Sequence, residues 1–136
     1  MRSALTSARN VLVADDERII ADTLALILNQ NGYRAIAVYS GEQALQAAAE
    51  STPHVLISDV VMGGMNGIEA ALAILRICPQ CHVILFSGQA VSADRLARHA
   101  VAHQFEILVK PVHPKTILEC LKAIEANVDG VFGSPR

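Results

Sequence analysis

Five short apolar runs, each followed by a segment with helix signals, constrain the fold of this chain more than any other feature. The runs are continuous and rich in β-branched residues, which is typical of strands covered on both faces of a parallel sheet. The predicted strands are Val11–Asp15, Ala35–Tyr39, Val55–Asp59, Val83–Ser87 and Glu106–Lys110. Because strands and helices alternate along the chain, the sequence predicts a doubly wound α/β sandwich.

The segments after the predicted strands carry the apolar spacing or the capping residues of helices. In the first of them Ile20, Leu24, Ile27 and Leu28 share a face that we expect to point inward, and Gly32 can end the helix. A capping-box pattern at Ser40 and Gln43 indicates the second helix, and Ile68, Leu72 and Leu75 before Pro79 indicate the third. The fourth helix is indicated by Leu96 and Ala100 after Ser92. The fifth would begin at Pro114 and is indicated by the apolar residues Ile117, Leu118, Leu121 and Ile124.

Composition argues against several classes of protein. The 136 residues are a length typical of one domain, and the 11 basic and 13 acidic residues form no basic run that would indicate a nucleic-acid partner. No stretch reaches the roughly 18 apolar residues of a membrane span, and the N-terminal "MRSALTSARN" lacks the apolar centre of a signal peptide. We therefore expect a cytoplasmic protein without a membrane partner. The three cysteines do not indicate a disulfide framework.

Polar residues stand at the ends of four predicted strands. Asp15 ends the first strand and Asp16 follows it, Asp59 ends the third, Ser87 the fourth and Lys110 the fifth. In a doubly wound sheet the carboxyl ends of parallel strands meet at one edge, where such folds bind ligands. Each residue alone has an ordinary explanation, such as a helix N-cap or a turn. Chance placement of all of them at successive strand ends is much less expected.

The carboxylates at this edge indicate a cation and phosphoryl chemistry. Two unit charges about 4 Å apart repel by roughly 4 kcal/mol at an effective dielectric near 20. Mg²⁺, or alternatively Mn²⁺, would remove this cost and suits carboxylates, water and a phosphoryl oxygen as ligands. Lys110 and Ser87 would then contact the other phosphoryl oxygens. Asp59 becomes the natural nucleophile, since carboxylates form aspartyl phosphates.

Four motifs, in order and spacing, resemble those of the receiver domain of two-component response regulators: "VADDE", "ISDVVMGGMNG", "LFSG" and "VKPV". The resemblance covers about Asn10 to Asn127 and is nearest in kind to stand-alone chemotaxis regulators. It implies a flavodoxin-like (βα)5 fold with five parallel strands in the order 2-1-3-4-5. The expected receiver unit is 10–127, between an N-terminal tail at 1–9 and a C-terminal tail at 128–136.

The resemblance also implies roles for individual residues. Asp59 would be the phosphoacceptor, and Asp15, Asp16, Asp59 and the backbone carbonyl of Val61 would hold Mg²⁺.

A second set of residues would bind the phosphoryl group. Ser87 would be the hydroxyl that moves toward it, Lys110 its cationic partner, and Gly88 a further contact. The Lys110–Pro111 peptide bond would be cis, which would help to aim the lysine.

The chain departs from the family at several positions. Ile107 stands where receivers usually have the Tyr or Phe that reads out the switch; Phe105, two residues earlier, would lie on the same face of the strand. Gly63 replaces a usual proline. Val61 and Gln89 stand at positions that influence the lifetime of the phosphoryl group. We hypothesise that Val61 limits water access and slows self-dephosphorylation; an unchanged aspartyl-phosphate half-life in Val61→Asn would contradict this.

The resulting prediction is a single-domain response regulator. It would accept a phosphoryl group from a sensor histidine kinase or a phosphotransfer protein, and would act on an unidentified protein target through phosphorylation-dependent binding, as a monomer or weak dimer. It would not be an enzyme, since it would catalyse only its own phosphorylation and dephosphorylation. The alternative is a receiver-like binding module that is not phosphorylated, which Ile107 favours and the intact acidic residues disfavour.

Other motifs indicate nothing further. "CPQCH", Cys78–His82, matches a haem-attachment pattern, but it would fall at the C-terminal end of a helix, where the dipole does not activate a thiol. We therefore expect loop cysteines rather than a haem, redox or metal site.

"GGMNG" matches neither common phosphate-binding loop. A dehalogenase-type phosphatase is disfavoured because Val60 and Val61 follow Asp59 without the required second aspartate.

Overall fold

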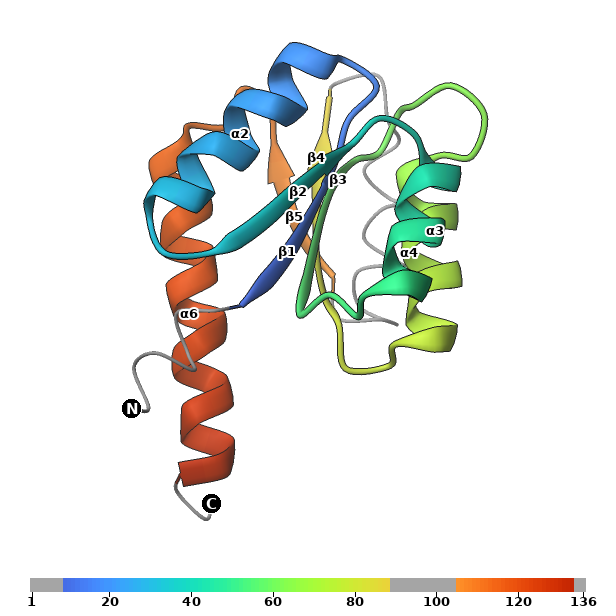
Figure 1. Cartoon of the computed structure of the whole chain (residues 1–136). Helices are drawn as coiled ribbons and strands as arrows, with labels where there is room; N and C mark the ends of the chain where they lie inside the picture. Colours follow the sequence, from blue (N-terminus) through green and yellow to red (C-terminus); the bar gives the residue numbers. More distant parts are fainter. Residues whose placement is uncertain (1–8, 89–104, 134–136) are drawn as a thin grey trace.

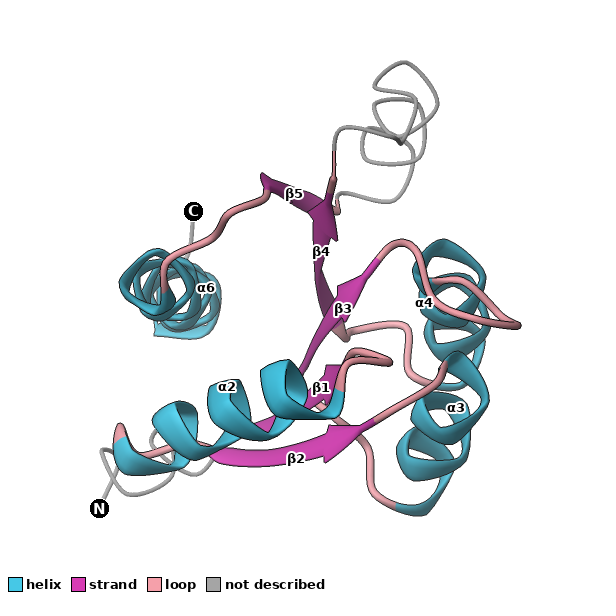
Figure 2. Cartoon of the chain, turned by 90° about the horizontal axis from the view of Figure 1, so that it is seen from above, coloured by secondary structure: helices cyan, strands magenta, loops and turns pink. Residues whose placement is uncertain are grey.

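A computed structural model describes residues 9–88 and 105–133. Within these residues, five parallel strands form one sheet in the order β2-β1-β3-β4-β5 (Figure 2). The strands are β1 (Asn10–Ala14), β2 (Arg34–Val38), β3 (Val55–Asp59), β4 (His82–Ser87) and β5 (Glu106–Val109). The doubly wound sheet and its strand order are therefore confirmed.

The helices cover both faces of the sheet. They are α2 (Arg18–Gln30), α3 (Gly41–Glu50), α4 (Gly67–Ile77) and α6 (Pro114–Gly133). Figure 2 shows α2 and α6 on one face and α3 and α4 on the other. The helix expected around Leu96 lies outside the described residues. None of the helices in the described ranges has the length and apolar character needed to cross a membrane.

Helix α6 extends beyond the sheet (Figure 1). Its backbone is helical to Gly133, so residues 128–133, which were expected to be a tail, continue the helix. Its first residue is Pro114, as the sequence predicts; a proline suits this position because its missing N–H would have no partner within the helix. The limit of the receiver unit at residue 127 stays a prediction.

The inward face of α2 differs from the one predicted. Its buried residues are Ala21, Leu24, Ala25 and Leu28. Ile20 was expected to point inward and is instead 41% exposed. The spacing of the small alanines with the two leucines is itself helical, and small inward side chains allow the helix to lie close to the sheet.

Strand β3 is the centre of the core. All of its residues, including Asp59, are buried. Leu56 belongs to the cluster under α3 and α4, whereas Val55 and Ile57 belong to the cluster under α2 and α6. This two-sided burial explains why the strand is a continuous apolar run.

The "CPQCH" cysteines lie in the core under α3 and α4. Cys78 and Cys81 are buried, and burial raises the pKa of Cys81 to about 12, with Cys78 contributing. A thiol with such a pKa is protonated at neutral pH and is a poor nucleophile or metal ligand. Both cysteines lie in the loop between α4 and β4, so the predicted loop position is confirmed, and their side chains are buried in the core.

The capping box predicted at Ser40 and Gln43 forms only one of its two hydrogen bonds. The Ser40 hydroxyl accepts from the Gln43 N–H at 3.0 Å, but Gln43 Oε1 accepts from the Tyr39 N–H rather than from Ser40. The complete capping box starts α4, where the Asn66 side chain accepts from the Glu69 N–H at 2.8 Å and Glu69 Oε1 accepts from the Asn66 N–H at 2.9 Å. This box fixes where the loop after Asp59 ends.

The start of α4 packs directly against the end of β3. A Cβ atom on Gly67 would overlap the Asp59 carbonyl oxygen and approach Ser58 Oγ at 3.0 Å. The Gly67 N–H also donates to the Val60 carbonyl at 2.8 Å. Only glycine fits here, because any side chain would push the helix away from the strand that carries Asp59.

We predict that Gly67→Ala lowers the free energy of unfolding by about 1–3 kcal/mol, the usual range for overpacking. Alanine ordinarily favours helices over glycine, so a loss would report the overlap with Asp59. Gly63→Ala in the same loop is the control, since a Cβ there would meet no described atom within 4 Å. Urea unfolding of both variants measures this, and equal free energies of unfolding would contradict the prediction.

Candidate functional site

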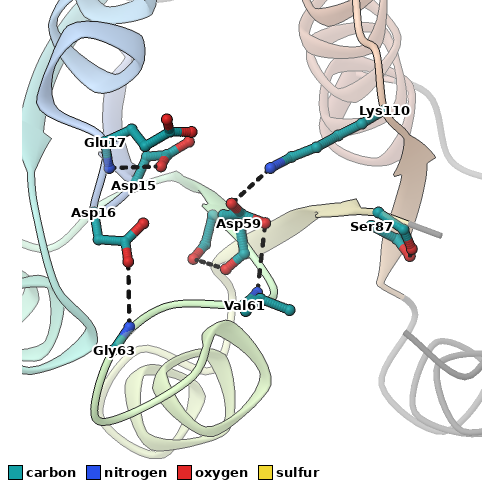
Figure 3. Close-up of polar contacts among 10 residues, drawn as sticks. Asp15, Asp16, Glu17, Asp59, Val61, Gly63, Ser87 and Lys110 are labelled. Carbon is teal, nitrogen blue, oxygen red and sulfur yellow. Dashed lines mark hydrogen bonds and ion pairs between the residues drawn. The ribbon is translucent and has the colours of Figure 1, made fainter. Parts of the chain in front are cut away.

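Three carboxylates converge at the carboxyl edge of the sheet (Figure 3). Asp15 and Asp16 follow β1, Asp59 ends β3, and each offers an oxygen within 4.8 Å of the others. Asp15 is 2% and Asp59 6% exposed, whereas Asp16 is exposed. The structure therefore brings together the acidic residues that the sequence placed at this edge.

The partners of the two buried carboxylates differ. Asp59 Oδ2 accepts from Lys110 Nζ at 2.7 Å, and its Oδ1 accepts a longer bond from the Val61 N–H at 3.4 Å. Asp15 Oδ1 accepts from the Glu17 N–H at 2.9 Å. The other oxygen, Asp15 Oδ2, is buried and has no hydrogen-bond partner among the described residues. A buried oxygen without a partner costs free energy, so this atom indicates a ligand position.

The pKa shifts at this edge report the crowding of charge. Burial is the main cause that raises the pKa of Asp15; the charges of Asp59 and Asp16 raise it further, while the Glu17 N–H and Lys110 oppose the shift. Burial acts to lower the pKa of Lys110, but its bond to Asp59 and the nearby negative charges raise it overall. Lys110 therefore stays protonated and compensates only part of the negative charge.

This donor set fits a hard divalent cation. Among the described residues, three carboxylates face one ammonium group, which leaves most of their negative charge uncompensated. Mg²⁺ prefers oxygen ligands, and Mn²⁺ accepts the same kind of donors. The unpartnered Asp15 oxygen would gain a partner from such an ion.

Ser87, Gly88 and Lys110 lie close together at the ends of β4 and β5, where the Lys110 N–H donates to the Ser87 carbonyl at 2.9 Å, but the Ser87 hydroxyl does not face Asp59. Ser87 ends β4 and is buried, and its Oγ donates to the Gly88 carbonyl at 3.1 Å. Figure 3 shows the ammonium group of Lys110 directed at Asp59 and the Ser87 side chain to one side. The Lys110–Pro111 peptide bond is cis, as the resemblance implies.

The residues expected to tune or read out the switch are only partly described. Gln89 lies outside the described residues. The Val61 side chain is 60% exposed. Phe105 and Ile107 both contact the cluster under α3 and α4, which confirms that they share a face. The roles assigned to these residues stay predictions.

Two carboxylate contacts to the loop after Asp59 were not predicted from the sequence. Asp16 Oδ2 accepts from the Gly63 N–H at 3.3 Å, and Glu42 Oε2, from α3, accepts from the Met65 N–H at 3.2 Å. Asp16 was assigned to the cation alone. Glu42 carried no signal beyond being an acid in the first turn of a helix, which helix dipoles favour anyway.

Comparisons with known proteins agree with this geometry. Residues 11–122 match the family model described as the response regulator receiver domain. The chain is 29% identical over 126 residues to the transcriptional regulatory protein YvrH of Bacillus subtilis, covering 92% of this chain and 51% of that protein. It is 27% identical over 119 residues to the DNA-binding response regulator MtrA of Mycobacterium tuberculosis, covering 87% and 51%. The chain thus spans about half the length of these two relatives.

Solved structures show the same fold. The chemotaxis protein CheY4 of Vibrio cholerae is similar with a TM-score of 0.75 and 27% identity, covering 85% of this chain and 98% of that one. A response regulator receiver domain protein from Clostridium thermocellum has a TM-score of 0.81 at 24% identity, covering 91% and 98%; it supports the fold alone.

We predict that Asp15→Asn stabilises the cation-free protein at pH 7. The raised pKa means that the folded state disfavours the ionised carboxyl, so ionisation costs stability above that pKa. A neutral amide removes this cost. The gain should shrink as the pH falls toward about 3.9, where the unfolded carboxyl also becomes protonated.

Urea unfolding in the presence of a chelator, at several pH values, measures this effect. Glu50→Gln, at the exposed end of α3, is the control for loss of a surface charge. Added Mg²⁺ should stabilise the unaltered protein but not Asp15→Asn, since a ligand stabilises only the state that binds it. A lower stability of Asp15→Asn at pH 7 would contradict the account.

Proposed function

Since the chain belongs to the response regulator receiver domain family, whose members act in two-component signalling, we propose that Asp59 accepts a phosphoryl group from a sensor histidine kinase or a phosphotransfer protein. Phosphorylation of an aspartate and binding of Mg²⁺ at an acidic pocket are typical of this family. We further propose that phosphorylation changes the affinity of the receiver for a protein target. DNA binding is a property stated for MtrA and is not proposed here for this chain.

The environment of Asp59 is the observation that carries the proposal. The carboxylate ends a strand that is buried over its whole length, yet it lies beside Asp15 and Asp16 and bonds to Lys110. A structural aspartate would need one compensating cation, whereas here the described part of the chain supplies one ammonium group to three carboxylates. The excess negative charge favours a cation, and this cation together with Lys110 would then stabilise the negative charge of a phosphoryl group on Asp59.

The reaction forms one bond and breaks one. An Asp59 oxygen attacks the phosphorus atom of the donor, and the bond from phosphorus to the donor histidine nitrogen breaks, with its electron pair staying on the nitrogen. Lys110, which bonds to Asp59 Oδ2, is placed to transfer its hydrogen bond to a phosphoryl oxygen. When bound by Asp15, Asp16, Asp59 and the Val61 carbonyl, Mg²⁺ would neutralise charge on the phosphoryl oxygens.

Ser87 would carry the change away from Asp59. Its hydroxyl donates to the Gly88 carbonyl, and it must leave this partner to donate to a phosphoryl oxygen. The exchange removes a bond from the backbone directly after β4, which is a local event of the kind that biases a two-state surface. Readout by Phe105 or Ile107, and control of the phosphoryl lifetime by Val61 and Gln89, remain part of the proposal.

We predict that incubation with Mg²⁺ and acetyl phosphate adds one phosphoryl group, detected by intact mass spectrometry. The adduct should be lost in Asp59→Asn and retained in Asp22→Asn, an exposed aspartate of α2. An adduct that persists in Asp59→Asn would refute the assigned acceptor. No adduct in any variant would favour the alternative, a receiver-like module that binds without phosphorylation, which the Ile107 departure supports.

The exposed side of α2 supports a docking surface for the phosphodonor protein. Ile19 is 81% and Leu26 58% exposed, on the helix that begins beside the acidic cluster. We predict that Ile19→Asp slows phosphoryl transfer from the cognate kinase about tenfold, as loss of an interface anchor commonly does. Transfer from acetyl phosphate should be unchanged, because this donor needs no docking surface. Equal kinase rates in both proteins would rule the surface out.

A further inference from the structure

The loop that follows Asp59, residues 60–66, is fastened at its tip to two different elements. The Gly63 N–H donates to Asp16 Oδ2 at 3.3 Å, and the Met65 N–H donates to Glu42 Oε2 at 3.2 Å. Asp16 belongs to the turn after β1, whereas Glu42 lies in the first turn of α3. Two carboxylates therefore hold one loop from two sides.

The contact with α3 is close as well as polar. A Cβ atom on Gly41 would lie 2.8 Å from the Met65 carbonyl oxygen, so the loop backbone rests directly on the start of α3. Gly64 has a φ of +72°, and a Cβ atom there would lie 3.1 Å from Glu42 Oε2. The first turn of α3 is thus in close van der Waals contact with the backbone at the loop tip.

The two hydrogen bonds differ in whether the acceptor carboxylate also belongs to the candidate cation site. Asp16 is also one of the three acids that converge on the candidate cation site, so an ion there would draw on the same carboxylate that accepts from the Gly63 N–H. Glu42 is not a member of that cluster. A cation bound by that cluster would therefore not draw on the carboxylate that accepts from the Met65 N–H.

We propose that Glu42 is a positioning residue, which holds the loop after Asp59 on α3 whether or not the cation site is filled. By fixing Met65 it limits where the preceding loop residues can lie, including Val61, whose N–H contacts Asp59. The hydrogen-bond role is independent of phosphorylation. Only its importance in the presence of Mg²⁺ rests on the proposed function.

A simpler role for Glu42 would be to stabilise α3. An acid in the first turn of a helix interacts favourably with the helix dipole, whatever its side chain contacts. Two conservative variants separate these roles. Glu42→Asp keeps the charge but is too short to reach Met65, whereas Glu42→Gln keeps the length and an acceptor oxygen but loses the charge.

The test is amide hydrogen exchange followed by NMR, first without metal. We expect the Met65 amide to exchange about tenfold faster in Glu42→Ala and Glu42→Asp, because its acceptor is lost, and to recover most of its protection in Glu42→Gln. Glu50→Ala, at the other end of α3, should leave Met65 unchanged. Amides of β3 report whether each variant is folded, and the Asp–Gln comparison holds even if Glu42→Ala unfolds.

Adding MgCl₂ tests the second part. In the unaltered protein Met65 should keep its protection, whereas in Glu42→Asp the ion should weaken the remaining Gly63 fastening and speed exchange across the loop. Met65 protection that follows charge, being kept in Glu42→Asp and lost in Glu42→Gln, would overturn the proposal. So would unchanged Met65 exchange in Glu42→Ala. If Mg²⁺ shifts no amide of the unaltered protein, the cation site fails, while the metal-free comparison still decides the role of Glu42.

Discussion

Repulsion among three carboxylates at one edge of the sheet is the constraint on which the rest of the site depends. The strand order creates it, because β1 and β3 are neighbours and their ends carry Asp15 and Asp59. Burial on both faces of β3 then prevents Asp59 from moving away. Lys110, beyond β4 at the end of β5, supplies partial compensation through its 2.7 Å contact. The site is in this way prepared for further positive charge and for a phosphoryl group.

The loop after Asp59 translates this constraint into a defined geometry. Gly67 allows α4 to begin against the carbonyl of Asp59, and the Asn66 capping box ends the loop at that point. Between these limits, Asp16 and Glu42 hold the loop tip. The glycines of this segment therefore have specific structural roles. Gly67 allows α4 to lie directly against Asp59, and Gly64 adopts a left-handed backbone conformation in the turn.

Much of the fold and the site could be predicted, since continuous apolar runs indicate parallel strands and parallel strands bring their ends together. Asp15, Asp59 and Lys110 were placed by that argument alone. The errors have local causes: Ile20 faces outward because alanines fill the inward positions of α2.

Contacts that depend on turn geometry or on a side-chain torsion leave no periodic signal. The bond from Met65 to Glu42 joins residues 23 positions apart, and the Ser87 hydroxyl bonds to the carbonyl of the next residue.

A crystal structure of the protein with Mn²⁺ and beryllofluoride, using the anomalous signal of the ion, tests the central claim most directly. The account predicts the ion among Asp15, Asp16 and Asp59, beryllofluoride on Asp59, and Lys110 bonded to a fluorine. An ion bound elsewhere, or Asp59 unmodified with its Lys110 pair intact, would contradict it.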